Sequence, residues 1–154
     1  MRKKYLLPAL LALLMLLSGC RSQAQPAQIA ATTLPVYEFT SRLCEGTPLT
    51  VTRLVTESVS CLHDYSLNVR QVKAAEAAEV VVISGAGLED FLDGILDDSD
   101  IIDSSDGIAL LHAEEDHDHG HEDHHHEDDP HIWLSPKNAK MMAGNICAGL
   151  SQRY

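Results

Sequence analysis

Basic residues are scarce in this chain of 154 residues. Lysine and arginine together number 11, against 23 aspartates and glutamates, and the formal net charge at pH 7 is −12. Proteins that bind nucleic acid neutralise its phosphates with lysine and arginine, so this composition argues against a nucleic-acid partner. A strongly acidic protein instead attracts cations.

The sequence also lacks an apolar run long enough to span a bilayer, which takes roughly 20 residues. Its main apolar run, Tyr5 to Leu17, follows three basic residues at positions 2–4, a pattern typical of an export signal. The run ends in Leu17-Ser18-Gly19-Cys20, which resembles the bacterial lipobox, where the signal is cut before a cysteine that then carries lipid. We therefore expect residues 1–19 to be a lipoprotein signal and Cys20 to anchor the protein to the extracytoplasmic face of the cell membrane. An ordinary secretory signal with an incidental cysteine is the alternative.

Cysteine is rare as well, with four in the chain. Export to an oxidising compartment permits disulfides. Lipidation of Cys20 leaves Cys44, Cys61 and Cys147, and because three is odd, at least one of them is a free thiol or pairs outside this stretch.

The 135 residues from Cys20 onward suffice for one hydrophobic core and not for two. Residues 20–28 are polar without periodicity and are interpreted as a tether. Strand and helix patterns then alternate: strands are expected at 29–33, 48–55 and 80–83, with short apolar runs at 101–102 and 108–111, and helices from position 35, at 68–78, from 88 and at 136–150. This order predicts a three-layer α/β lobe with a mostly parallel sheet. In such sheets ligands bind beyond the carboxyl ends of the strands.

Two motifs suggest enzymes, but the first lacks a residue of its pattern and the second lacks the packed helix that it needs. Gly85-Ala86-Gly87 follows an expected strand, as a dinucleotide fingerprint does, but the third glycine is missing and a plain tight turn is favoured. His121 to His125 matches H-E-x-x-H, which forms a zinc-protease site only when both histidines project from one face of a packed helix. The flanking residues provide no apolar stripe to pack such a helix. The sequence therefore predicts a binding protein and not an enzyme.

Eight of the nine histidines lie between Leu111 and Trp133, together with nine acidic residues between Glu114 and Asp129. The stretch 112–126 has one small apolar residue, Ala113, so it cannot form a core of its own. Neutral imidazoles among carboxylates favour weak, rapidly exchanging metal binding over a single tight site. We predict an auxiliary metal-binding loop, with an inert acidic loop as the alternative; its histidines are His112, His117, His119, His121, His124, His125 and His126.

Two other histidines lie at element boundaries. His63 follows the second expected strand, and His131 precedes a helix that Ser135 is placed to cap. The parallel topology places both at the same edge of the sheet, so we predict that His63 and His131 share one metal ion. Individually, each could instead be a capping or core histidine.

Three blocks of the sequence resemble the zinc-binding, substrate-binding lipoproteins of bacterial metal ABC transporters, the ZnuA-like cluster that includes manganese binders. The blocks are TTLPVYEF, HDYSLNVRQVKAAEAAEVVVISGAGLEDFL and DPHIWLSPKNA, and the resemblance runs from about Ile29 to Leu150. It implies that His63 and His131 are the first two metal-ligating histidines. It also implies that the stretch 112–126 is the variable histidine-rich insertion of the zinc members.

The chain departs from the family at three points. Ser135 stands where the family usually has aspartate, and Leu62 stands where some members carry an acidic residue near the metal. Family members have two lobes joined by a long helix, and their second lobe supplies a third histidine and a carboxylate. We therefore interpret residues 29–154 as the first lobe, without the second.

The resemblance implies that the complete protein is a monomer that captures Zn²⁺ outside the cytoplasm and hands it to an ABC permease driven by its ATPase. It also raises cell adhesion as an associated role. A histidine-rich loop favours zinc over Mn²⁺. A metal-storage lipoprotein and a manganese-binding member of the family are the alternatives.

The expected topology also bears on the cysteines. Helices between parallel strands run back along the sheet, so Cys44 and Cys147, near helix ends, are expected at the edge opposite the metal. Cys61 is expected at the metal edge, a strand length away. A disulfide needs Cα atoms within about 7 Å, so Cys44–Cys147 is the favoured pairing.

Overall fold

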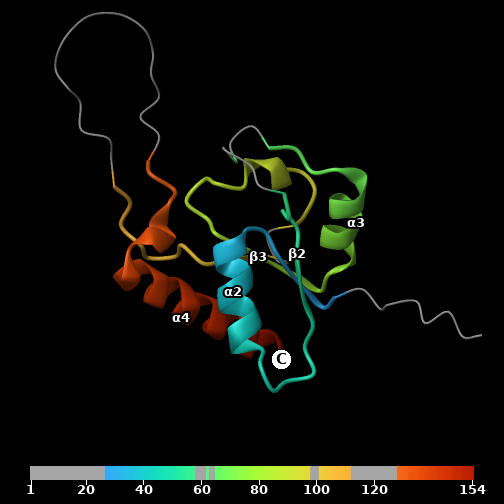
Figure 1. Cartoon of the computed structure of the whole chain (residues 1–154), viewed down its shortest axis with the longest axis horizontal. Helices are drawn as coiled ribbons and strands as arrows, with labels where there is room; N and C mark the ends of the chain where they lie inside the picture. The colour runs from blue at the N-terminus through green and yellow to red at the C-terminus, as the bar shows by residue number, and fades with distance from the viewer. Residues whose placement is uncertain (1–26, 58–61, 63–64, 98–100, 112–127) are drawn as a thin grey trace, which may run out of the picture.

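The computed structural model describes residues 27–57, 62, 65–97, 101–111 and 128–154. Their central feature is a four-stranded sheet in the order β2-β1-β3-β4, in which every pairing is parallel. The strands are β1 (Ile29–Ala31), β2 (Val51–Arg53), β3 (Val80–Ile83) and β4 (Ile101–Asp103). The predicted parallel α/β lobe is thus confirmed (Figure 1).

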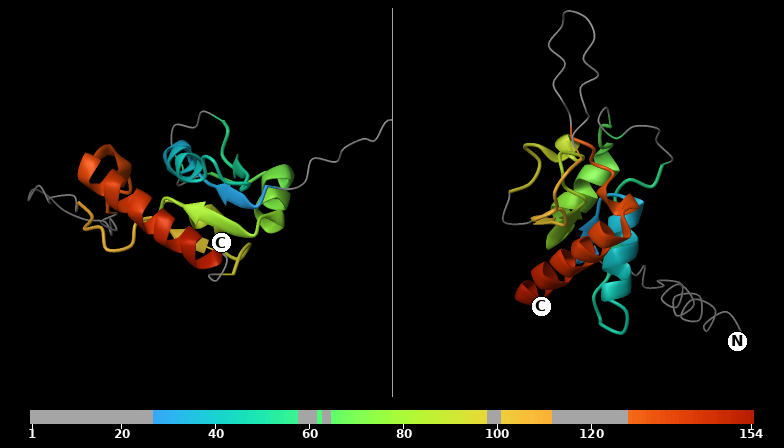
Figure 2. Two further views of the ribbon diagram at one scale, coloured as in Figure 1. Left: turned by 90° about the horizontal axis from the view of Figure 1, so that it is seen from below. Right: turned by 90° about the vertical axis from the view of Figure 1, so that its left-hand side faces the viewer.

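The two central strands, β1 and β3, bury side chains on both faces of the sheet, because successive side chains in a strand point to opposite sides. Ile29 and Val80 pack into one core with helices α2 (Leu34–Leu43) and α4 (Pro136–Arg153). Ala30 and Val81 pack into the other core with helix α3 (Val69–Ala77) and the short 3₁₀ helix η1 (Asp90–Leu92). The sheet therefore lies between two helical layers, with α2 and α4 together on one side and α3 on the other (Figures 1 and 2).

The helices begin where the sequence predicts, although one cap differs. Asn68 accepts hydrogen bonds from the backbone of Arg70 and Gln71, and the side chain of Gln71 accepts one from the Asn68 amide, which completes a capping box at the start of α3. Ser135 occupies the N-cap position of α4, but its side chain makes no capping hydrogen bond. The start of α4 therefore depends on Pro136, whose φ angle is pre-set for the first helical position.

Two expected elements are absent from the part of the chain that the structure describes. The helix expected from Leu88 is reduced to η1, whose tight turns include a hydrogen bond of 2.9 Å from the Leu92 amide to the Glu89 carbonyl. No strand forms at 108–111. Instead, Ile108 donates to the carbonyl of Ser105 and turns the chain, and only Leu111 makes an isolated bridge.

The predicted tight turn after β3 is present. Gly85, Ala86 and Gly87 all have positive φ angles, of 82°, 57° and 76°. A Cβ at Gly85 would overlap the Asp103 carboxylate and the Ser105 hydroxyl, so only glycine fits where β3 and β4 end side by side.

Among the described residues, none of the helices is both long and apolar enough to cross a membrane.

Candidate metal site

His131 lies on a short, well-anchored segment at the carboxyl edge of the sheet. It caps the 3₁₀ helix η3 (Ile132–Leu134), and Leu134 donates a hydrogen bond to its carbonyl at 3.2 Å. Ile132 is buried in the core beside α4 and fixes this turn against the lobe. The side chain of His131 is 54% exposed, so its ring is open to a ligand from solvent.

The ring of His131 is held by two neighbours in the chain. Its Nδ1 lies 2.7 Å from Oδ1 of Asp129, and its backbone N–H donates to the same oxygen at 3.0 Å. These hydrogen bonds hold the pKa of Asp129 below its ordinary value, first through the backbone amide and then through the ring. Trp133 meets the ring edge-on, with centroids 5.2 Å apart. Nε2 makes no hydrogen bond to any residue that the structure describes, so it is the ring nitrogen available to a metal.

A cavity of about 380 Å³ opens beside this segment. It is bounded by the start of α2, by the chain that follows β2 and by η3; its lining residues are Thr33, Leu34, Pro35, Arg53, Val55, Thr56, Glu57, Leu62 and Trp133. We call it the carboxyl-edge cavity. Leu62 immediately precedes His63, and Trp133 contacts His131. One residue close to each predicted ligand, Leu62 for His63 and Trp133 for His131, therefore lines this cavity.

Hydrogen bonds among Glu57, Tyr65 and Gln71 fix the chain just before and just after residues 58–64. Tyr65 donates to Oε2 of Glu57 at 3.0 Å. Gln71 Nε2 lies 2.6 Å from the Tyr65 hydroxyl, 3.1 Å from Glu57 Oε2 and 2.8 Å from the carbonyl of Leu54. Tyr65 also packs edge-on against Phe91, with ring centroids 5.4 Å apart. Because Gln71 belongs to the capping box of α3, the chain that leads into and out of this segment is tied to a helix end.

Of the predicted metal ligands, the structure places only His131. His63, the seven histidines of the stretch 112–126 and Cys20 lie outside the described residues. The amide of Asp129 donates to the carbonyl of Leu111 at 3.0 Å. Leu111 and Asp129, which lie on either side of this stretch in the sequence, are therefore side by side, and Asp129 is bonded to His131. Within the described residues, no three histidine, cysteine, aspartate or glutamate side chains are grouped closely enough to hold a metal ion together.

Sequence reasoning did not find the buried carboxylate of Glu89. Oε1 accepts hydrogen bonds from the Thr32 hydroxyl at 2.7 Å and the Ser84 amide at 2.8 Å, and Oε2 accepts one from the Gly85 amide at 2.9 Å. These bonds join the carboxyl ends of β1 and β3. Burial raises the pKa of Glu89 to about 7, although the three hydrogen bonds oppose the shift. The sequence signal was its position, an acid within an apolar stretch just after a strand-end glycine turn.

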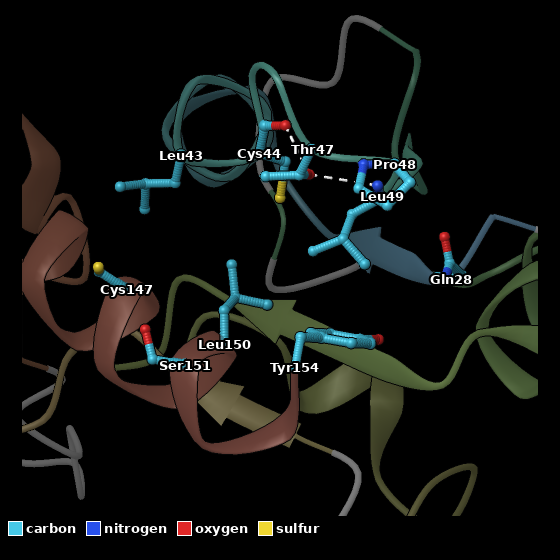
Figure 3. Close-up of a pocket in the computed structure, with 10 residues that line it drawn as sticks. All are labelled: Gln28, Leu43, Cys44, Thr47, Pro48, Leu49, Cys147, Leu150, Ser151 and Tyr154. Atoms are coloured by element: carbon cyan, nitrogen blue, oxygen red, sulfur yellow. Dashed lines mark hydrogen bonds between the residues drawn. The ribbon is translucent and has the colours of Figure 1, made fainter.

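Cys44 and Cys147 lie together at the opposite, amino edge of the sheet, as the topology predicted. Both line a cavity of about 530 Å³ between the ends of α2 and α4, with Leu150 and Tyr154 (Figure 3). Both are free thiols, so the expected Cys44–Cys147 disulfide is not present. Helices α2 and α4 bring Cys44 and Cys147 to the same cavity, but their sulfur atoms are not bonded. Cys61 lies outside the described residues.

Known proteins resemble this chain in sequence and in fold. Residues 29–154 match the family model described as "ZnuA: Zinc-uptake complex component A periplasmic". The chain is 35% identical over 166 aligned residues to the zinc-binding lipoprotein AdcA of Streptococcus pneumoniae serotype 4, an alignment that covers 100% of this chain and 32% of AdcA.

Solved structures share the fold, among them two with a bound metal. The crystal structure of Zn(II)-bound AdcA from Streptococcus pneumoniae has a TM-score of 0.64 and 29% identity, over 83% of this chain and 26% of that one. A mutant of the periplasmic metal binding protein from candidatus liberibacter asiaticus, in its Mn-bound form, has a TM-score of 0.65 and 25% identity, over 81% of this chain and 45% of that one.

The chain thus spans about a third of the length of the AdcA relative and less than half of each solved chain. What it shares with them is one α/β lobe. The family that it matches consists of substrate-binding proteins and not of enzymes. The chain belongs to the ZnuA family of periplasmic zinc-uptake components.

Proposed function

We propose that this chain is the metal-binding lobe of a lipid-anchored, extracytoplasmic zinc-binding protein that delivers Zn²⁺ to an ABC permease and its ATPase. His63 and His131 are its fixed ligands. The observation that supports this most directly is that Trp133, whose ring meets that of His131, lines the same cavity as Leu62, the neighbour of His63. Zinc takes imidazole nitrogen as a ligand at about 2.0–2.1 Å.

The stretch 112–126 has a separate role in this proposal. Its seven histidines gather zinc weakly, and its ends at Leu111 and Asp129 keep that zinc close to His131. A short flexible tether gives effective concentrations in the millimolar range, so ions held there would be readily transferred to the fixed ligands. Lipidation at Cys20 would keep the protein, as a monomer, at the cell membrane where its permease lies.

Zinc is the proposed metal because imidazole ligands suit zinc better than manganese and because the AdcA relative is named a zinc-binding lipoprotein. Manganese remains the second candidate, since one similar solved structure is Mn-bound. A storage protein would not need an ordered lobe with histidines at its strand ends. The comparisons give no support for a role in cell adhesion, and we do not propose one.

Zinc titration of residues 20–154 against a competing chelator tests the proposal. Zinc prefers four ligands in a tetrahedron and this lobe provides two fixed ones. We therefore expect several weak sites and no tight one, and deletion of 112–126 should lower the number of ions bound. His63→Ala and His131→Ala should each remove the same residual site from the deleted chain. If the two variants removed different sites, or neither removed any, the shared ion would be wrong.

A further inference from the structure

The contact between Asp129 and His131 has a consequence for metal capture. Both the Nδ1 atom and the backbone amide of His131 lie within hydrogen-bond distance of a single oxygen, Oδ1 of Asp129, at 2.7 and 3.0 Å. An ionised carboxylate can only accept hydrogen bonds. Nδ1 must therefore carry the proton, and the lone pair of the neutral ring is on Nε2.

The chain is anchored before and after the contact between Asp129 and His131. On one side the amide of Asp129 pairs with the carbonyl of Leu111 at 3.0 Å. On the other side Ile132, 5% exposed, anchors the turn that carries His131. Between them Pro130 fixes its own φ angle at about −65°. The Asp129 carboxylate is therefore already in place before a metal ion binds.

We propose that Asp129 is a positioning residue for the metal: its carboxylate holds His131 as the Nδ1–H tautomer and presents Nε2 as the ligand. This inference rests on the proposed function. Histidine ligands commonly donate their second ring N–H to a carboxylate, which fixes the ring orientation and raises the basicity of the coordinating nitrogen. When Nε2 binds a cation, the Nδ1 proton becomes more acidic and its bond to Asp129 strengthens.

The single accepting oxygen allows a discriminating pair of variants. Asp129→Asn keeps a carbonyl oxygen that can accept both hydrogen bonds and removes only the charge. Asp129→Ala removes both bonds, while the backbone pairing with Leu111 remains possible because it involves no side-chain atom. Asp97→Ala is a charge-matched control at an exposed position on another loop.

The first measurement is the tautomer of His131 in the metal-free ¹⁵N-labelled chain at pH 8, by long-range ¹H–¹⁵N correlation, with the signal assigned from His131→Gln. We expect Nδ1–H in the parent chain, in Asp129→Asn and in Asp97→Ala, and a shift toward Nε2–H in Asp129→Ala. A purely structural role for Asp129 would not select between the two tautomers. The parent chain in the Nε2–H form, or an unchanged tautomer in Asp129→Ala, would overturn the inference and leave the proposed function intact.

The second measurement is the free zinc concentration at which the His131 ring signals shift. Loss of a carboxylate partner typically weakens metal binding 10–100-fold, so we expect that loss in Asp129→Ala, a smaller one in Asp129→Asn and none in Asp97→Ala. A changed tautomer with unchanged zinc response would overturn the positioning role. If His131 in the parent chain failed to respond to zinc at all, the proposed function itself would be wrong.

Discussion

At the scale of single residues, the most consequential buried group is the carboxylate of Glu89. Glu89 is 6% exposed and joins the ends of β1 and β3 through Thr32, Ser84 and Gly85. Its environment favours the protonated form more than water does, because burial disfavours a charge. The scaffold that presents the metal edge is therefore sensitive to pH.

We expect stability to fall as pH rises through the range of this group. The pKa of Glu89 is raised from 4.5 to about 7, so between these values the folded chain holds a proton that the unfolded chain has lost. The stabilisation is complete below pH 4.5 and is lost as pH passes 7, a change of about 3 kcal/mol at 1.36 kcal/mol per pKa unit. Urea unfolding of the parent chain and Glu89→Gln between pH 4.5 and 8 measures it. The free-energy difference between the two should change by this amount, and parallel curves would contradict the prediction.

At the scale of elements, the turn after β3 shows how a short segment joins two strand ends. Ser104 donates its hydroxyl to the carbonyl of Ser84 at 2.9 Å, and the Ala86 amide donates to the Ser105 hydroxyl at 3.1 Å. The turn therefore packs directly on the residues that follow β4. Glu89, bonded to the amides of Ser84 and Gly85, draws the next segment onto this turn and accounts for a 3₁₀ turn in place of the expected helix.

Two glycines of this turn provide a matched test. Gly85 and Gly87 have similar φ angles, of 82° and 76°, but a Cβ would collide only at Gly85. Gly87→Ala should cost about 1–2 kcal/mol, the usual cost of left-handed backbone for a residue with a side chain. Gly85→Ala adds overpacking, which costs about 1–3 kcal/mol more. Denaturant midpoints compare them, and equal losses would show that the turn can open away from β4.

At the scale of the whole molecule, zinc bound by His63 and His131 should stabilise the fold, whereas zinc bound by the stretch 112–126 should not. A ligand stabilises a protein only if it binds the folded state better than the unfolded one. The stretch 112–126 cannot form a core of its own, so its histidines should bind zinc equally in both states. His63 and His131 can share an ion only when the lobe brings them together.

Thermal unfolding with and without zinc tests this difference. The chain without residues 112–126 should keep most of the rise in Tm that zinc produces, and chelation should reverse it. His63→Ala and His131→Ala should each lose that rise even though the histidine-rich stretch still binds zinc. At a zinc concentration about 100 times the Kd of the shared site, the stabilisation should be about 2.7 kcal/mol. If deletion of 112–126 abolished the rise in Tm that zinc produces, the zinc site linked to folding would lie in that stretch.

The class of the fold can be inferred from the amino-acid sequence without any tertiary information. Apolar runs such as Val80 to Ile83 can be satisfied only in a sheet covered on both faces, and their alternation with helical patterns requires parallel connections. The position of His131 at an element boundary could be predicted for the same reason, since topology alone assigns strand ends to one edge. The position of His63 stays a prediction, because it lies outside the described residues.

Which side chains contact one another becomes visible in the folded chain and not in the sequence pattern. The bonds of Glu89 to two strand ends, the shared cavity of Cys44 and Cys147 without a disulfide, and the contact of Asp129 with His131 all depend on distances of a few ångströms. Local pattern carries no information on the distances at Glu89 and between the two cysteines, because they are set by how the helices and loops pack on the sheet. The distance between Asp129 and His131 is set by the turn that contains Pro130. The hydrogen bonds of Glu89, and not helix propensity, left the segment after Gly87 as a 3₁₀ turn.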